Sequence, residues 1–198
     1  MPPKMKITRE MIVDAGFEIV RENGLEGLTV RAIADRLGCS TQPILYGFKT
    51  AGEIKRAVYD KVNLFHTEYL MNLGDPSGVM LGIGLNYIRF AIREPNLFRF
   101  LFQSGYAAEN SLLEMVESEE LLPILRLMSG AMKMSLERTK RVFLTIAMFA
   151  HGYASIIANN SLEYDEKLAA AHLERAYRGA VLAETEEEAS SAGKEGTE

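Results

Sequence analysis

The segment from residue 40 to residue 49 carries side chains whose chemistry suits contact with double-stranded DNA. The amide of Gln42 can donate and accept a hydrogen bond at once, as two-point recognition of adenine in the major groove requires. Thr41 and Leu45 can touch thymine methyl groups, and Lys49 can bind a phosphate. Residues suited to phosphate contact extend the predicted DNA-binding set, which is Thr29, Arg31, Ser40, Thr41, Gln42, Leu45, Tyr46 and Lys49.

These side chains can read a groove only if a helix presents them, and residues 29–48 predict two short helices joined by a tight turn. Thr29 is a good N-cap for the first helix, and Gly38 can take the left-handed backbone that ends it. Ser40 then precedes a second helix with Pro43 in its first turn. The pattern is typical of a helix-turn-helix, whose second helix enters the major groove.

The inner side of this motif is apolar. Helical spacing places Ile44 inward, together with Cys39 and Phe48, so that the polar residues of the second helix stay free. A preceding helix is predicted from about Thr8 to Asn23. The segment Thr50-Ala-Gly-Glu53 is a capping-box pattern that opens a long fourth helix, which would link the head to the rest of the chain.

Residues 8–62, with the run TREMIVDAGFEIVRENGLEGLTVRAIADRLGCS, resemble the DNA-binding domain of the TetR/AcrR family of transcriptional regulators. Aligned without gaps on Gly38 and Phe48, the family's usual tyrosine corresponds to Leu45 and its usual lysine to Ala51. Both family residues typically contact the DNA backbone. Tyr46 and Lys49 are the nearest replacements.

The rest of the chain predicts further helices, at about 77–93, 96–103, 111–116, 121–137, 139–160 and 165–183. The runs YIRFAIREPNLFRFLF and FAHGYASIIANNSLEYDE resemble TetR regulators with a WHG-type C-terminal domain, with Ala150 in the place of the tryptophan before His151-Gly152. The resemblance implies an all-helical homodimer whose body binds a small-molecule effector. The last two helices, apolar on several faces, would pack against their copies in a second subunit.

Aromatic, methionine and histidine side chains in the body are candidates to line an effector pocket. Each is equally compatible with plain core packing, and a histidine on an apolar helix is more often a satisfied core residue than a ligand contact. The candidates are Tyr87, Phe98, Phe102, Tyr106, Met115, Met128, Phe149 and His151.

Charge is unevenly distributed along the 198 residues. Residues 1–62 hold ten Lys and Arg against eight Asp and Glu, whereas the remainder holds twelve against nineteen, giving the overall net charge of −5. A mildly basic head on an acidic body is consistent with DNA binding at one end. The single cysteine excludes an internal disulfide, and no apolar stretch is predicted to reach the length of a membrane span, so the cytoplasm is expected. No metal site is predicted, because the three histidines fall on different helices without a nearby thiol or paired carboxylates. No cofactor is predicted.

The sequence therefore predicts an all-α protein with a helix-turn-helix DNA-binding domain at residues 1–50, a helical ligand-binding and dimerisation domain at residues 51–183, and a disordered acidic tail at residues 184–198. The predicted function is that of an effector-released transcriptional repressor that binds operator DNA. Two alternatives remain open. One is a helical enzyme that uses His151 as acid and base near Tyr153 or Glu163; the other is a ligand-binding or adaptor module with a vestigial head.

Overall fold

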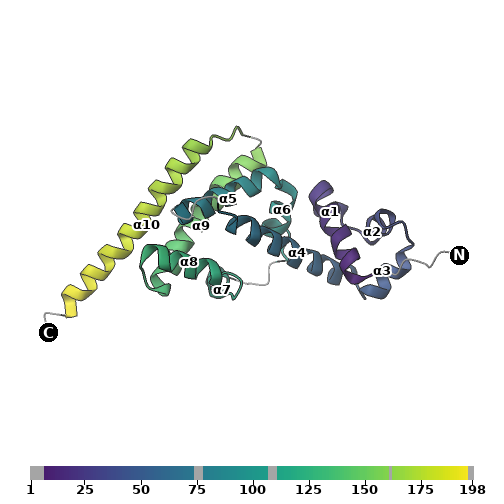
Figure 1. The fold of residues 1–198 in the computed structure, drawn as a ribbon, viewed down its shortest axis with the longest axis horizontal. Coiled ribbons are helices and arrows are strands. Elements are labelled where there is room, and N and C mark those ends of the chain that lie inside the picture. The colour runs from purple at the N-terminus through teal and green to yellow at the C-terminus, as the bar shows by residue number, and fades with distance from the viewer. Residues whose placement is uncertain (1–6, 74–77, 107–110, 161, 196–198) are drawn as a thin grey trace. The chain divides into compact units, whose positions relative to one another are not determined.

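The computed structural model describes residues 7–73, 78–106, 111–160 and 162–195, and within these ranges every regular element is a helix (Figure 1). The predicted all-α class is confirmed. The helices are α1 (Arg9–Gly27), α2 (Val30–Arg36), α3 (Thr41–Gly47), α4 (Ala51–Met71), α5 (Val79–Arg93), α6 (Pro95–Gln103), α7 (Leu112–Glu117), α8 (Leu122–Met132), α9 (Leu136–Asn160) and α10 (Glu166–Glu195).

The chain forms two compact units. Unit 1 comprises residues 1–68 and 93–108, and unit 2 comprises residues 69–92 and 109–198. This division differs from the predicted domains, because α6 belongs to the same unit as α1 although it lies in the sequence between two helices of unit 2. The functional boundaries at residues 50 and 183 remain predictions.

Polar contacts explain why α6 joins unit 1. The guanidinium of Arg21 on α1 makes a two-point ion pair with the carboxylate of Glu94, which directly precedes α6. The amide of Asn96 donates to the backbone carbonyls of Arg21 and Glu22 at 3.0 and 3.2 Å. These carbonyls lie just before Gly24, where the backbone leaves helical geometry at φ 72°. Asn96 therefore satisfies acceptors that the end of a helix leaves without intrahelical partners.

The start of α4 bears out the predicted capping pattern. The backbone N–H of Glu53 donates to the hydroxyl of Thr50 at 3.1 Å. The carboxylate of Glu53 reaches back to accept from the N–H of Lys49 at 3.0 Å, one residue beyond the position that the pattern predicts. The helix then runs continuously to Met71, so one element carries the chain from unit 1 into unit 2.

The other end of α4 is held inside unit 2 by a buried amide. The Nδ2 of Asn86 on α5 donates to the carbonyls of Tyr69, Leu70 and Asn72 at distances of 3.1–3.3 Å. Its Oδ1 accepts from Arg89, which also makes a two-point ion pair with Glu166 at the start of α10. Apolar side chains from α4, α5 and α8 also form a buried cluster in unit 2, made of Leu70, Val79, Ile83, Ile124 and Met128.

Two predicted helix ends were misplaced. The stretch predicted as one helix to residue 137 breaks at Lys133, which adopts left-handed backbone at φ 52° and so ends α8. The last helix does not stop at residue 183 but continues to Glu195, while residues 196–198 of the predicted tail lie outside the described residues. Glu184 explains part of this extension, because its carboxylate binds Arg141 at 2.7 Å and its backbone carbonyl accepts from Arg138.

Helix α9 corrects the prediction about membrane spans. Its 25 residues include a window with a mean hydropathy of 1.5, long and apolar enough by composition to cross a membrane. The prediction that no stretch reaches this length was therefore wrong. The reason is that apolar residues occupy both the face of α9 that packs against the rest of unit 2 and the face that is exposed. A helix in the core of a globular protein can have the same composition.

The ion pair at Glu184 gives a pH-dependent prediction. Hydrogen bonding to Arg141, with the charges of Arg141 and Arg138, lowers the pKa of the Glu184 carboxyl in the folded protein. A carboxyl whose pKa is lower in the folded than in the unfolded protein stabilises the fold at pH values above its unfolded-state pKa. This stabilisation is lost as the pH falls through the folded-state pKa. Glu184→Gln should therefore lower the melting temperature by about 2–4 °C at pH 7, and the gap should close below about pH 4.5.

The measurement is thermal unfolding of parent and variant from pH 7 to pH 3. The matched control is Glu186→Gln, two residues further along the same helix, where the side chain is exposed and no change is expected. A gap that stays constant down to pH 3 would contradict the ion-pair account.

Candidate DNA-binding surface and effector pocket

The turn between α2 and α3 has the geometry that the sequence predicts. The hydroxyl of Thr29 accepts from the N–H of Ala32 at 3.1 Å, which makes Thr29 the N-cap of α2. Gly38 has φ 63°, the left-handed conformation that glycine adopts without steric cost. Ser40 occupies the N-cap position of α3, although its hydroxyl makes no capping hydrogen bond. The helix-turn-helix is thus formed by local backbone chemistry.

The inner face of α3 packs against α1. Ile44 and Phe48 are fully buried, as predicted, and Cys39 is half-buried. Gly47 allows a close approach, because a Cβ atom at this position would lie 2.9 Å from the Cδ1 of Ile12. Because this face is buried, the rotation of α3 about its own axis is fixed. This rotation determines which side chains point outward.

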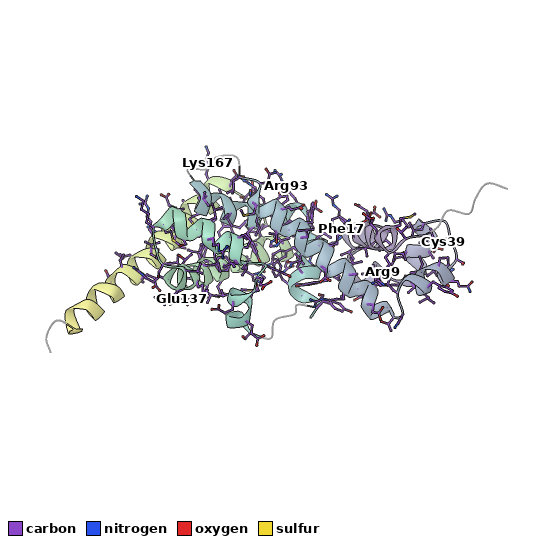
Figure 2. All side chains as sticks on the ribbon, turned by 60° about the horizontal axis from the view of Figure 1, so that its bottom comes forward. Arg9, Phe17, Cys39, Arg93, Glu137 and Lys167 are labelled. Atoms are coloured by element: carbon purple, nitrogen blue, oxygen red, sulfur yellow. The ribbon has the colours of Figure 1, made fainter. Side chains whose placement is uncertain are left out.

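Arg9, labelled in Figure 2, fixes the C-terminal end of α3. Its Nη1 donates to the carbonyl of Gly47 at 2.5 Å, and its guanidinium lies 3.9 Å from the centre of the Phe48 ring. A cation near the last carbonyls of a helix also complements the helix dipole. No local sequence pattern indicates this contact, because the two residues are 38 positions apart.

All eight predicted DNA-binding residues have exposed side chains. Six of them belong to α3 or to the residues that flank it. Tyr46 is the most prominent, with 87% of its surface exposed, and Leu45 is 50% exposed. Arg31 is free of strong pairing, since its nearest carboxylate oxygen, on Asp35, lies 4.0 Å away. The head therefore presents polar and apolar side chains around one short exposed helix.

The predicted pocket residues are divided between the two units. Phe98, Phe102 and Tyr106 lie in unit 1, where the rings of Phe98 and Phe102 are 5.0 Å apart and Tyr106 contacts Phe100. The other five lie in unit 2. Among these, Met128 is part of the buried cluster, and Phe149 is 37% exposed.

Tyr87 and His151, two of the predicted pocket residues in unit 2, make a polar side-chain contact. The Tyr87 oxygen lies 2.8 Å from Nδ1 of His151, and Nε2 lies 3.3 Å from the hydroxyl of Ser155. With the hydrogen on Nε2, Tyr87 donates to Nδ1 and the imidazole donates to Ser155. Burial raises the pKa of Tyr87 and lowers the pKa of His151, so both are neutral at pH 7.

Unit 2 also contains a cavity of about 260 Å³ that the sequence did not indicate. It lies between helices α5, α8, α9 and α10, and an ion pair between Glu174 and Arg178 lies at its wall. Its lining residues are Gly78, Val79, Met80, Leu81, Ala131, Ile146, Leu173, Glu174, Tyr177 and Arg178. None of the predicted pocket residues is among them. Within the described ranges of the chain, no group of three or more potential ligands could hold a metal ion.

The Arg9 contact generates a stability prediction. Arg9→Gln removes the charge–carbonyl hydrogen bond and the stacking on Phe48, and should lower the free energy of unfolding by about 1 kcal/mol, a value limited by solvent exposure. Urea unfolding measures the change. Arg31→Gln is the matched control, because this side chain is exposed and its nearest carboxylate belongs to its own helix. Equal stability of the Arg9 variant and the parent would show that the contact does not hold α3.

Comparison with known proteins agrees with this architecture. No family model matches the chain. The tetracycline repressor proteins of class D from Escherichia coli and class H from Photobacterium damsela subsp. piscicida are each 44% identical to it over 41 residues, which is 21% of this chain. The match spans only 18% of the length of these relatives.

Solved structures resemble the chain over most of its length. A TetR-family transcriptional regulator from Streptomyces coelicolor superposes with a TM-score of 0.69 at 12% identity, covering 89% of this chain and 81% of the other. The multidrug binding protein EbrR, complexed with imidazole, superposes with a TM-score of 0.60 at 16% identity, covering 85% and 93%. Fold and local sequence similarity together give this chain the architecture of the TetR family of transcriptional regulators.

Proposed function

We propose that the chain is a transcriptional repressor that binds operator DNA through α3 and is released by a small-molecule effector. The observation that carries the proposal is the helix-turn-helix, which buries Ile44 and Phe48 and exposes every predicted DNA-binding side chain. The named relatives, which are repressors and regulators, support it over the enzyme that would use His151. We propose a cytoplasmic protein that needs no cofactor and no membrane.

Within this proposal the exposed residues of α3 divide by chemistry. Gln42 reads a base edge, and Thr41 and Leu45 contact thymine methyl groups. Ser40, Tyr46 and Lys49 contact phosphates, as do Thr29 and Arg31 from α2, so that the head is held in register on the duplex. Tyr46 takes the place of the family tyrosine that Leu45 replaces, because its phenol projects into solvent one residue further along.

The proposed active form is a homodimer. A helix-turn-helix dimer places two recognition helices about 34–36 Å apart so that both enter successive major grooves. We assign the contact between subunits to α9 and α10, because exposed apolar side chains collect there, with Met148, Phe149, Ile156, Leu168 and Leu182 each 37% exposed or more. The His151-Gly152 pair supports a body of the WHG type.

We place effector binding in the helical body that follows the helix-turn-helix, residues 51–183. EbrR is a multidrug binding protein seen with imidazole and with ethidium, which supports a comparable role for a helical body of this fold. Tyr87 and His151, with Met115, Met128 and Phe149, offer hydrogen-bonding and apolar groups for such a ligand, and Phe98, Phe102 and Tyr106 remain candidates from α6 and the residues that follow it. An effector that binds better to the DNA-free arrangement of the dimer lowers operator affinity by that difference in binding free energy.

The DNA-binding role is tested by contrasting two substitutions on duplexes that the parent protein enriches from a random pool. Gln42→Ala should cost about 1–3 kcal/mol at the enriched site and relax base preference, because alanine cannot make the two-point hydrogen bond to the base. Lys49→Ala should weaken binding to every duplex and reduce the salt dependence by roughly one unit for each phosphate that Lys49 binds in the parent. Fluorescence anisotropy at several salt concentrations measures both effects.

Tyr46→Phe is the third variant in this DNA-binding comparison. Removal of the phenolic hydroxyl alone should resemble a weaker form of Lys49→Ala, with base preference unchanged. If Gln42→Ala keeps its base preference, α3 reads DNA in another register. If all three variants bind like the parent, α3 is not the DNA-binding element.

A further inference from the structure

The cavity between α5, α8, α9 and α10 has an apolar floor and a polar rim. Its floor consists of Val79, Ile146 and Leu173, each at most 8% exposed. Its rim consists of exposed residues, and on α10 these include Glu174 and Arg178, which carry opposite charges. Benzene fills an engineered apolar cavity of about 150 Å³ in another protein, so a cavity of about 260 Å³ has room for a larger apolar group. An apolar floor with a few polar groups beside it is typical of a small-molecule site.

The polar groups at the rim are richer in hydrogen-bond donors than in acceptors. The Nη2 of Arg178 donates to Oε1 of Glu174 at 2.5 Å. A guanidinium carries five N–H donors, so Arg178 can bind a second acceptor through Nε or Nη1 while it stays paired. The half-buried Tyr177 adds a phenol, and burial raises the pKa of Tyr177, so its hydroxyl is protonated and can donate at pH 7. These donors favour a ligand whose polar end is an acceptor with a negative charge.

The cavity is distinct from the sites named in the proposed function. Neither Tyr87 nor His151 is among its lining residues. With 3.6 residues per turn, Leu173 faces a different side of α10 from Leu168 and Leu182, the exposed leucines assigned to the contact between subunits. A molecule bound in this cavity would therefore occupy neither the predicted pocket nor the proposed subunit contact.

We propose that this cavity binds a small amphipathic carboxylate, whose apolar part lies on the floor and whose carboxylate group binds Arg178 and Tyr177 at the rim. The planar guanidinium of arginine matches the two oxygens of a carboxylate and binds them with two parallel hydrogen bonds. An ammonium group at the same place would be repelled by the charge of Arg178. Glu174, the acidic residue among those that line the cavity, is already paired with Arg178 and attracts such a group less strongly.

The test is isothermal titration calorimetry of the full chain, in buffer without DNA, with three naphthalene ligands that differ in their polar end. Naphthalene-2-carboxylate should bind one molecule per chain. It should bind at least about 10-fold more tightly than naphthalene-2-carboxamide, which has nearly the same shape but no charge. The cation 2-(aminomethyl)naphthalene should bind more weakly than both. Tightest binding of the cation would overturn the assignment of a carboxylate, and no binding of any of the three ligands would overturn the site.

Two substitutions on α10 should change the affinity for the carboxylate ligand in opposite directions. Arg178→Gln removes the cation and should raise the dissociation constant at least about 10-fold. Glu174→Gln removes a negative charge that competes for Arg178 and should lower the dissociation constant by about 3-fold. Arg175→Gln is the matched control, because Arg175 is exposed on the same helix but does not line the cavity, and no change is expected. If Arg178→Gln and Glu174→Gln both bind the carboxylate like the parent, the proposal is wrong.

A third substitution tests the floor of the cavity. Ile146→Phe adds a ring to the floor and should weaken binding of the carboxylate and of the carboxamide alike, each by about 10-fold, because the naphthalene group loses its space. Far-UV circular dichroism checks that the variant keeps its helix content. Parent-like binding by a folded Ile146→Phe variant would overturn the proposed position of the ligand. Should this variant fail to fold, the contrast between Arg178→Gln and Glu174→Gln decides.

Discussion

The packing of α3 against α1 is the constraint on which the head depends. A helix of seven residues makes few internal hydrogen bonds and has little stability of its own, so its position comes from what it buries. Ile44 and Phe48 provide the buried face, Gly47 allows the close approach, and Arg9 closes the end. The exposure of Gln42 and Tyr46 follows from this packing, since burying one face of so short a helix leaves the opposite face in solvent.

The same reasoning explains why a helix from the middle of the chain belongs to the head. Glu94 pairs with Arg21, and Asn96 binds carbonyls at the end of α1, so α1 has a second helix fixed to it besides α3. The helix against which α3 packs therefore also holds α6, which follows directly after a helix of unit 2 in sequence. The chain therefore passes between the two units at residues 92–93 as well as within α4.

The features of the fold that could be predicted are those that depend on residues close together in the sequence. Thr29, Gly38 and the spacing of Ile44 and Phe48 act within a few residues, and the helix-turn-helix was predicted from them with its inner and outer faces. The missed features depend on contacts between residues far apart in sequence. Arg9 reaches Gly47 across 38 positions, and Glu184, which prolongs α10, depends on arginines of α9 more than 40 positions earlier. The end of α8 was missed for a different reason. Lys133 adopts a left-handed backbone conformation, which is not expected of a lysine from its residue type.

Asn86 shows how much can depend on the identity of a single atom. Its Nδ2 faces three carbonyl oxygens at the end of α4, and its Oδ1 faces the guanidinium of Arg89. Aspartate has almost the same shape but would turn an oxygen toward those three oxygens and add a buried negative charge. The last turn of α4 is thus tied to α5 by the amide nitrogen and its two hydrogens, which makes position 86 intolerant of the most nearly isosteric replacement available to it.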